Sequence, residues 1–123
     1  MKAKFRFMDL EIWKESISLN DKMYDLADMI DTKRKYRTAE QLRGASLSVS
    51  NNIAEGSGSF SNKDFAHFLN MARRSVFEVV NVLVVSHQRK FINQDQLDQF
   101  IEELDVLSRK ITNFRKSILN SKT

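Results

Sequence analysis

The sequence predicts an all-α protein, an antiparallel up-down-up-down four-helix bundle, and three observations lead to that prediction. The 123 residues include no proline and only three glycines, although turns and strand ends normally use both. Four segments place apolar residues three and four positions apart, which is the spacing of one helix face. Short polar corners with helix-capping residues separate these segments. A chain of this length can bury one adequate core, so residues 1–123 are expected to form a single domain.

The first two helices are expected at residues 10–30 and 38–56. Asp9 is the candidate N-cap of the first helix, and a charged loop from Asp31 to Arg37 follows it. Its apolar face is expected to hold Leu10, Trp13, Ile17, Tyr24 and Ala27. The run from Thr38 to Gln41 has the pattern of a capping box and opens the second helix. The apolar stripe of the second helix is Leu42, Ala45, Ser46, Val49 and Ile53.

Two glycines are expected to end the second helix, because a glycine just past the last turn readily adopts the left-handed conformation that closes a helix. These are Gly56 and Gly58, and the run from Ser61 to Asp64 then caps a third helix at residues 62–88. The apolar face of the third helix holds Phe65, Phe68, Leu69, Ala72, Val76, Val79, Val80 and Leu83. A cap from Asn93 to Gln96 opens the fourth helix at residues 94–119. Its near-heptad repeat is Leu97, Ile101, Leu104, Leu107, Ile111, Phe114 and Ile118.

The valine-rich segment from Val79 to Val85 has strand propensity, because β-branched side chains lose rotamer freedom in helices. No second segment could pair with it as a strand, and a lone strand would leave its backbone groups without partners. We therefore predict a helix here. Since this helix is apolar nearly all round from Val76 to Val85, we expect self-association to cover its outer side. The alternative is that the loops and the N-terminal Phe5 and Phe7 cover it.

A row of small and polar residues lies on one flank of the second helix, beside its apolar stripe. Such a row favours the close approach of another helix, with hydrogen bonds across the seam. Any of Arg43, Arg73 and Arg74 could neutralise the acid at the end of the row. The row is Gln41, Gly44, Ser48, Asn52 and Glu55.

Several functional classes are disfavoured by the residues present. The chain has no cysteine, which excludes disulfides and thiolate metal sites and suits a reducing compartment. Neither histidine, His67 or His87, follows a glutamate at the spacing that di-iron bundles use, so no metal site is expected. We find no nucleophile motif, phosphate loop or cofactor motif. With no signal peptide and no membrane-length apolar run, we expect a cytoplasmic protein. Because these catalytic motifs are absent, we expect that the protein is not an enzyme.

A modest excess of positive charge favours anionic partners. The net charge is +4, and four cations surround Tyr36 in the loop between the first two helices, namely Lys33, Arg34, Lys35 and Arg37. In an up-down bundle Arg89 and Lys90 lie at the same end, although Asp95 and Asp98 would weaken the field there. The opposite end is expected to collect Lys2, Lys4, Arg6, Arg115 and Lys116. A solvated surface that complements the helix dipoles is the alternative reading of Arg115 and Lys116.

Three motifs in order resemble the four-helix-bundle proteins encoded in intervening sequences of 23S ribosomal RNA genes. They are the DLEIW opening from Asp9, the long QLRGASLSVSNNIAEG run from Gln41 to Gly56, and Lys63-Asp64-Phe65. The resemblance implies an up-and-down bundle that assembles into homopentamers, with no established enzymatic activity. A similar fold serves as the accessory variability protein of diversity-generating retroelements, which binds nucleic acid beside a reverse transcriptase. The sequence departs from the family's pattern at Ser50, where proline is frequent, and after Gly56, where basic residues are replaced by Ser57, Gly58, Ser59 and Phe60.

Together these observations predict a homo-oligomeric bundle that binds RNA or DNA, or an enzyme that acts on them, with little sequence preference. The expected contact residues are Lys33, Arg34, Lys35, Arg37, Arg89 and Lys90. The alternative is a purely structural protein-protein interaction module without nucleic-acid binding.

Overall fold

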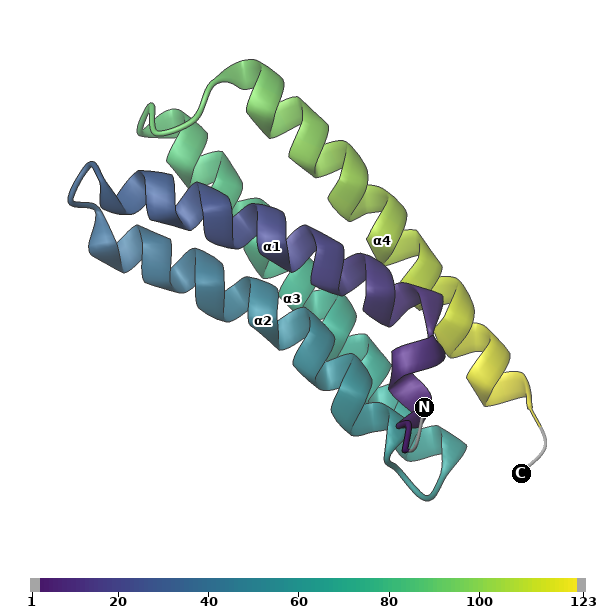
Figure 1. Cartoon of the computed structure of the whole chain (residues 1–123). Helices are drawn as coiled ribbons and strands as arrows, with labels where there is room; N and C mark the ends of the chain where they lie inside the picture. Colours follow the sequence, from purple (N-terminus) through teal and green to yellow (C-terminus); the bar gives the residue numbers. More distant parts are fainter. Residues whose placement is uncertain (1–2, 122–123) are drawn as a thin grey trace.

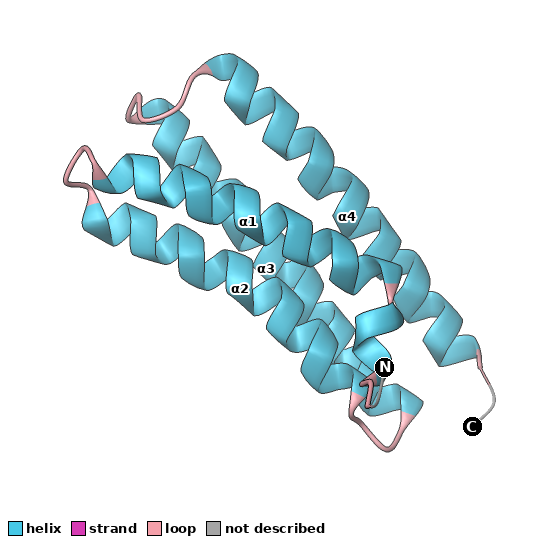
Figure 2. Ribbon diagram, in the orientation of Figure 1, coloured by secondary structure: helices cyan, strands magenta, loops and turns pink. Residues whose placement is uncertain are grey.

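Four long α-helices follow a short 3-10 helix in the computed structural model of the chain, which describes residues 3–121. The 3-10 helix η1 spans Arg6–Asp9, and the α-helices are α1 (Glu11–Asp31), α2 (Tyr36–Ser57), α3 (Asn62–Gln88) and α4 (Gln94–Asn120). Figure 2 colours these elements, and no strand occurs within the described part of the chain. The prediction of an all-α fold is confirmed.

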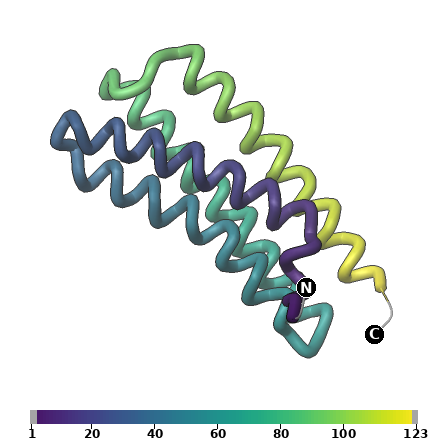
Figure 3. Tube along the Cα trace, viewed as in Figure 1, coloured from purple at the N-terminus to yellow at the C-terminus, as the bar shows by residue number. Residues whose placement is uncertain are grey.

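Consecutive helices run in opposite directions, as Figure 1 shows. The α1–α2 and α3–α4 connections lie at one end of the bundle, whereas η1, the α2–α3 connection and the end of α4 lie at the other, a path that the trace in Figure 3 follows. Within residues 3–121, no helix is long and apolar enough to cross a lipid bilayer.

The core takes one face from each helix, and for α2 the predicted stripe is confirmed, since all five of its residues are buried. On α3 and α4 most of the predicted face is buried as well. The exceptions are only partly buried: Val80 of α3 and Ile101 and Phe114 of α4 pack against the core, and Phe68 of α3 lies beside Gly56.

The predicted face of α1 is wrong in its orientation. Of the five residues expected in the core, only Ala27 is buried, while Leu10, Trp13, Ile17 and Tyr24 are partly buried. A polar member of the true face explains the error: the Ser16 hydroxyl donates a 2.7 Å hydrogen bond to the Trp13 carbonyl, so this serine is satisfied inside the core. The buried residues of α1 are Ile12, Ser16, Leu19, Met23, Leu26, Ala27 and Ile30.

The N-caps predicted for α1 and α2 are also wrong, whereas those of α3 and α4 are confirmed. Asp9 belongs to η1 and pairs with Lys4 at 2.6 Å, because the chain makes a 3-10 turn before α1 begins. Thr38 lies inside the first turn of α2, which begins at Tyr36. For α3, the Ser61 hydroxyl accepts from the Asp64 amide at 3.1 Å, and α4 opens with the reciprocal bonds of a capping box between Asn93 and Gln96.

Neither glycine at the end of α2 adopts the expected left-handed conformation. Gly58 caps the helix at φ −85°, and Gly56 lies within its last turn. A Cβ atom on Gly56 would stand 2.6 Å from Cβ of Phe68 and 2.9 Å from Cδ1 of Phe65. The physical role of Gly56 is therefore close packing against α3 rather than a turn.

The valine-rich segment is helical throughout, so the strand reading is excluded for it. Val76, Val79 and Val82 are buried, but Phe77 and Val84 remain 55% and 41% exposed on the single chain. The four helices therefore leave part of α3's apolar surface uncovered. One further side of the bundle is open, because α1 and α4 share far fewer contacts than the other neighbouring pairs and diverge in Figure 1 toward the α1–α2 connection.

Candidate nucleic-acid interface

Six exposed basic side chains lie at one end of the bundle, which we call the basic end. The α1–α2 connection with the first turn of α2, and the α3–α4 connection, supply them, and both lie at the same end in Figure 1. Within residues 3–121 none of the six takes part in an ion pair. Between them Tyr36 is 59% exposed, which leaves an aromatic face available beside the cations. The six are the predicted Lys33, Arg34, Lys35, Arg37, Arg89 and Lys90.

Two of these cations occupy left-handed backbone positions. Arg34 has φ 62° and Lys90 has φ 65°, and no other non-glycine residue in the described chain has a positive φ. At the end of α3, the Phe91 amide bonds the Ser86 carbonyl at 2.7 Å, and the Lys90 amide bonds the His87 carbonyl at 2.9 Å, which is a Schellman motif. Glycine is the usual residue there, and a side chain costs about 1 kcal/mol or more. The chain therefore retains cations where glycine would be more stable.

The start of α2 is a positive pole without a counter-charge. Its N-cap, Lys35, makes no side-chain hydrogen bond, and its first turn contains no acid. By contrast, the first turns of α3 and α4 hold Asp64 and Asp95 behind side-chain caps. Free backbone amides and the helix dipole attract anions, and Lys35 and Arg37 add positive charge at a pole that ordinarily disfavours it. Attraction to the negative end of the helix dipole therefore explains the cations that follow α1 and α3. It does not explain Lys35 and Arg37, which lie at the positive end of α2.

Arg43 gathers the acidic side chains that adjoin this loop. Its guanidinium contacts carboxylate oxygens of Asp28, Asp31 and Glu40 at 2.6 Å each. The hydrogen bonds that the Arg43 guanidinium donates, first to Asp31 and next to Asp28, raise its pKa. Part of the acidic charge near the loop is thus offset within the fold. Asp98 accepts a hydrogen bond from Gln94 at the start of α4 and still lowers the positive potential at this end.

Of the five cations predicted at the opposite end, three are engaged in the fold. Lys4 pairs with Asp9, the Arg6 guanidinium lies 5.1 Å from the centre of the Phe65 ring, and Arg115 Nε donates to the Ala66 carbonyl at 3.0 Å. Lys116 is exposed, and Lys2 lies outside the described residues. Among residues 3–121, Lys14, Lys63 and Lys116 stay exposed and without an ion pair near this end, fewer than the six cations of the basic end.

The polar row of α2 is split between two surroundings. Ser48 shares a 2.8 Å hydrogen bond with Ser75 across the α2–α3 seam, while Asn52 donates back to the Ser48 carbonyl of its own helix. Gln41 and Gly44 are exposed, and no side chain or neighbouring helix comes within 4 Å of a Cβ placed on Gly44. Glu55 is exposed on the side of the N-terminal segment and has no ion pair with Arg43, Arg73 or Arg74 within residues 3–121.

The two histidines lie apart from any ligand cluster. Within the described residues, no group of three or more His, Asp or Glu side chains could hold a metal ion. His67 is exposed in the second turn of α3, where its ring stands 6.0 Å from that of Phe68, and His87 is partly buried near the end of the same helix.

Sequence reasoning missed two features. The uncapped start of α2 was hidden by the capping-box pattern at Thr38, although the lack of an acid after Lys35 was a visible signal. A cavity of about 320 Å³ between α1 and α4 gave no signal in the sequence, because it depends on how far the two helices diverge.

Comparisons with known proteins agree with the four-helix architecture. A family model described as 23S rRNA-intervening sequence protein matches residues 8–113. Among solved structures, one similar chain is a protein of unknown function from the S23 ribosomal protein family of Bacteroides thetaiotaomicron. The two superpose with a TM-score of 0.81 at 17% identity, covering 85% of this chain and 98% of that one, a likeness that shows the fold. No curated protein matches the chain.

Proposed function

Because the chain belongs to the 23S rRNA-intervening sequence protein family, which is matched over residues 8–113, we propose that it is a homo-oligomeric, non-enzymatic binding protein. It assembles into a ring in the cytoplasm, of five copies as the family resemblance implies, and binds the phosphates of RNA or DNA at the basic end. The uncapped, cation-rich start of α2 carries the proposal, because the free amides and positive pole of the helix lie at the same helix start as Lys35 and Arg37.

Phosphate contacts of this kind do not read sequence, so the binding is sequence-tolerant. Tyr36 adds a preference for single strands, because an exposed ring stacks on unpaired bases, a contact worth about 1–3 kcal/mol per base. A ring would present one basic end per copy, so weak individual sites would bind a long strand together. The left-handed Arg34 and Lys90 support the same reading, since cations are kept there at the expense of stability.

Fluorescence anisotropy with a labelled, mixed-sequence single-stranded RNA at rising KCl tests the proposal. Replacing Lys33, Arg34, Lys35 and Arg37 by Ala should weaken binding strongly. It should also reduce the slope of log K against log salt by up to about 3 per chain, since each phosphate on a single strand contributes about 0.7.

A charge-matched control replaces four other exposed cations, Lys14, Lys63, Arg74 and Lys116, by Ala. This control has the same net charge as the test variant and should keep most of the affinity. Equal losses in the two variants would refute the basic end as the site, and no binding by the wild type at low salt would favour the purely structural module. Tyr36→Ala should weaken single-strand binding more than duplex binding.

The uncovered apolar surface supports the oligomeric part of the proposal. Phe77 and Val84 on α3 and Val106 on α4 are each more than two-fifths exposed, and exposed apolar groups of this size mark interfaces. Light scattering after size-exclusion chromatography should give a mass of several 14.4 kDa chains. A single-chain mass at micromolar concentration would refute assembly, and would leave the phosphate site to be judged on the anisotropy titration alone.

A further inference from the structure

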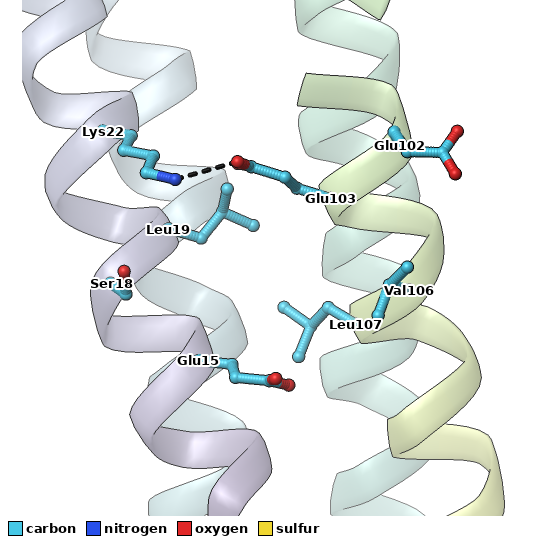
Figure 4. Close-up of a pocket in the computed structure, with 8 residues that line it drawn as sticks. All are labelled: Glu15, Ser18, Leu19, Lys22, Glu102, Glu103, Val106 and Leu107. Atoms are coloured by element: carbon cyan, nitrogen blue, oxygen red, sulfur yellow. Dashed lines mark hydrogen bonds and ion pairs between the residues drawn. The ribbon is translucent and has the colours of Figure 1, made fainter. Parts of the chain in front are cut away.

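A groove on the open side of the bundle separates α1 from α4. The floor of the roughly 320 Å³ cavity is apolar, with Leu19 from α1 and Leu107 from α4, and Val106 lies at its edge. Figure 4 shows Glu15 reaching from α1 toward α4, and Glu103 reaching back toward Lys22. The groove therefore has an apolar base between charged rims, which is the lining that an amphipathic helix needs.

The acidic groups of the groove have unused hydrogen-bonding capacity. Lys110 Nζ bonds Oε1 of Glu15 at 2.6 Å, and Lys22 Nζ bonds Oε1 of Glu103 at 2.8 Å. Oε2 of Glu15 and Oε2 of Glu103 are both enclosed and accept no hydrogen bond. Glu102 is exposed and makes no ion pair within residues 3–121. A cationic donor approaching the groove from outside would therefore pair with the exposed Glu102 at its rim.

A stripe along one flank of α3 complements the groove, because it is apolar and carries one cation. We call it the docking stripe. Its four residues, Arg73, Phe77, Val80 and Val84, follow one another at intervals of four, three and four, the spacing by which one helix packs along others. Phe77 is 55% exposed and Val84 is 41% exposed. The Arg73 guanidinium lies 4.7 Å from the centre of the Phe77 ring and has no carboxylate partner within the described chain.

We propose that the docking stripe of one copy lies in the α1–α4 groove of the next copy. Arg73 then meets Glu102 at the rim of the groove, and the apolar residues of the stripe cover Leu19, Val106 and Leu107. A second copy fits better than another partner, because both halves of the contact are present on this chain with opposite charges. The stripe and the groove are different surfaces, so the contact is head-to-tail, and the ring of the proposed function forms where the rotation between neighbouring copies closes. This inference rests on the homo-oligomer of the proposed function and names its interface.

Two neighbouring valines provide a matched test. Val84 and Val85 are 41% and 42% exposed on the same helix, but successive helix positions point about 100° apart, so only Val84 belongs to the stripe. Val84→Glu should reduce the light-scattering mass to a single 14.4 kDa chain, whereas Val85→Glu should leave the wild-type mass. Circular dichroism should show the same helix content in both variants, since both side chains lie at the surface.

A mixing experiment tests the head-to-tail geometry. Val106→Glu damages the groove and leaves the stripe intact, while Val84→Glu does the reverse. Each variant alone should be a monomer, but an equimolar mixture should form a complex of two chains, because one undamaged stripe and one undamaged groove remain to pair.

Each other outcome contradicts a stated part of the inference. A Val84→Glu variant that keeps the wild-type mass would refute the docking stripe while leaving oligomerisation intact. A mixture that stays monomeric would refute the head-to-tail pairing. A wild type that is itself monomeric would refute both this interface and the assembly proposed above.

Discussion

Replacing Gly56 by alanine should destabilise the protein, although the same replacement usually stabilises a helix. The new Cβ would lie 2.6 Å from Cβ of Phe68, an atom that moves only with the α3 backbone, and 2.9 Å from the Phe65 ring. Separating two packed helices to relieve such contacts costs about 1–3 kcal/mol. Alanine gains about 1 kcal/mol over glycine in helix propensity. We expect a net loss of up to about 2 kcal/mol.

Gly44→Ala is the matched control, because nothing lies within 4 Å of the added Cβ and the site is exposed in the same helix. This variant should gain about 1 kcal/mol. Since both variants receive the same propensity gain, the difference between their free energies of unfolding isolates the overpacking at Gly56, which should be about 1–3 kcal/mol. Urea unfolding followed by circular dichroism measures it, at one fixed chain concentration because assembly adds stability. A Gly56→Ala variant as stable as Gly44→Ala would refute the close approach of α2 and α3.

Three further substitutions test other parts of the fold. Lys90→Gly should raise the free energy of unfolding by about 1 kcal/mol, because glycine adopts the left-handed conformation without strain, and the same variant should bind RNA more weakly; a drop in the urea midpoint would contradict the assigned backbone conformation. Arg43→Ala should lower the free energy of unfolding by about 1 kcal/mol, and Arg43→Lys by nearly as much, since an ammonium cannot span three carboxylates as a guanidinium does. A lysine variant with the thermal midpoint of wild type would contradict the shared contact. Asn93→Ala should lower the free energy of unfolding by about 1 kcal/mol, because the capping box is lost. A thermal midpoint equal to that of wild type would contradict the reciprocal bonds at the start of α4.

Much of the fold could be predicted because the apolar stripes of α2, α3 and α4 are regular. The stripe of α2 was found even though Ser46 is part of it, since four apolar residues flank that serine at helical spacing. On α1 apolar residues occur on two faces, and periodicity alone could not decide between them. Packing decided in favour of the face that contains Ser16, whose hydroxyl is satisfied by its own helix.

Helix starts and ends were predicted less well, because several local patterns compete at each corner. Thr38 has good capping chemistry, yet α2 begins at Tyr36 without a side-chain cap. Gly56 has the flexibility for a turn, but its lack of a side chain is used for contact with Phe68. The six predicted contact residues were placed correctly at one end, since alternating helix directions bring the two connections together. The α1–α4 groove depends on the divergence of two helices, which no local pattern encodes.

The arrangement of connections and chain ends affects how a ring would present itself. Both cationic connections leave the bundle at one end, and η1 and the last turn of α4 leave it at the other (Figure 1). If copies are related by rotation about an axis parallel to the helices, every bundle points the same way. One rim would then carry all the phosphate-binding loops, and the other rim would carry η1 and the last turn of α4 of every copy. Tags at either terminus would leave the first rim free, and a surface that captures such tags would display it uniformly to solution.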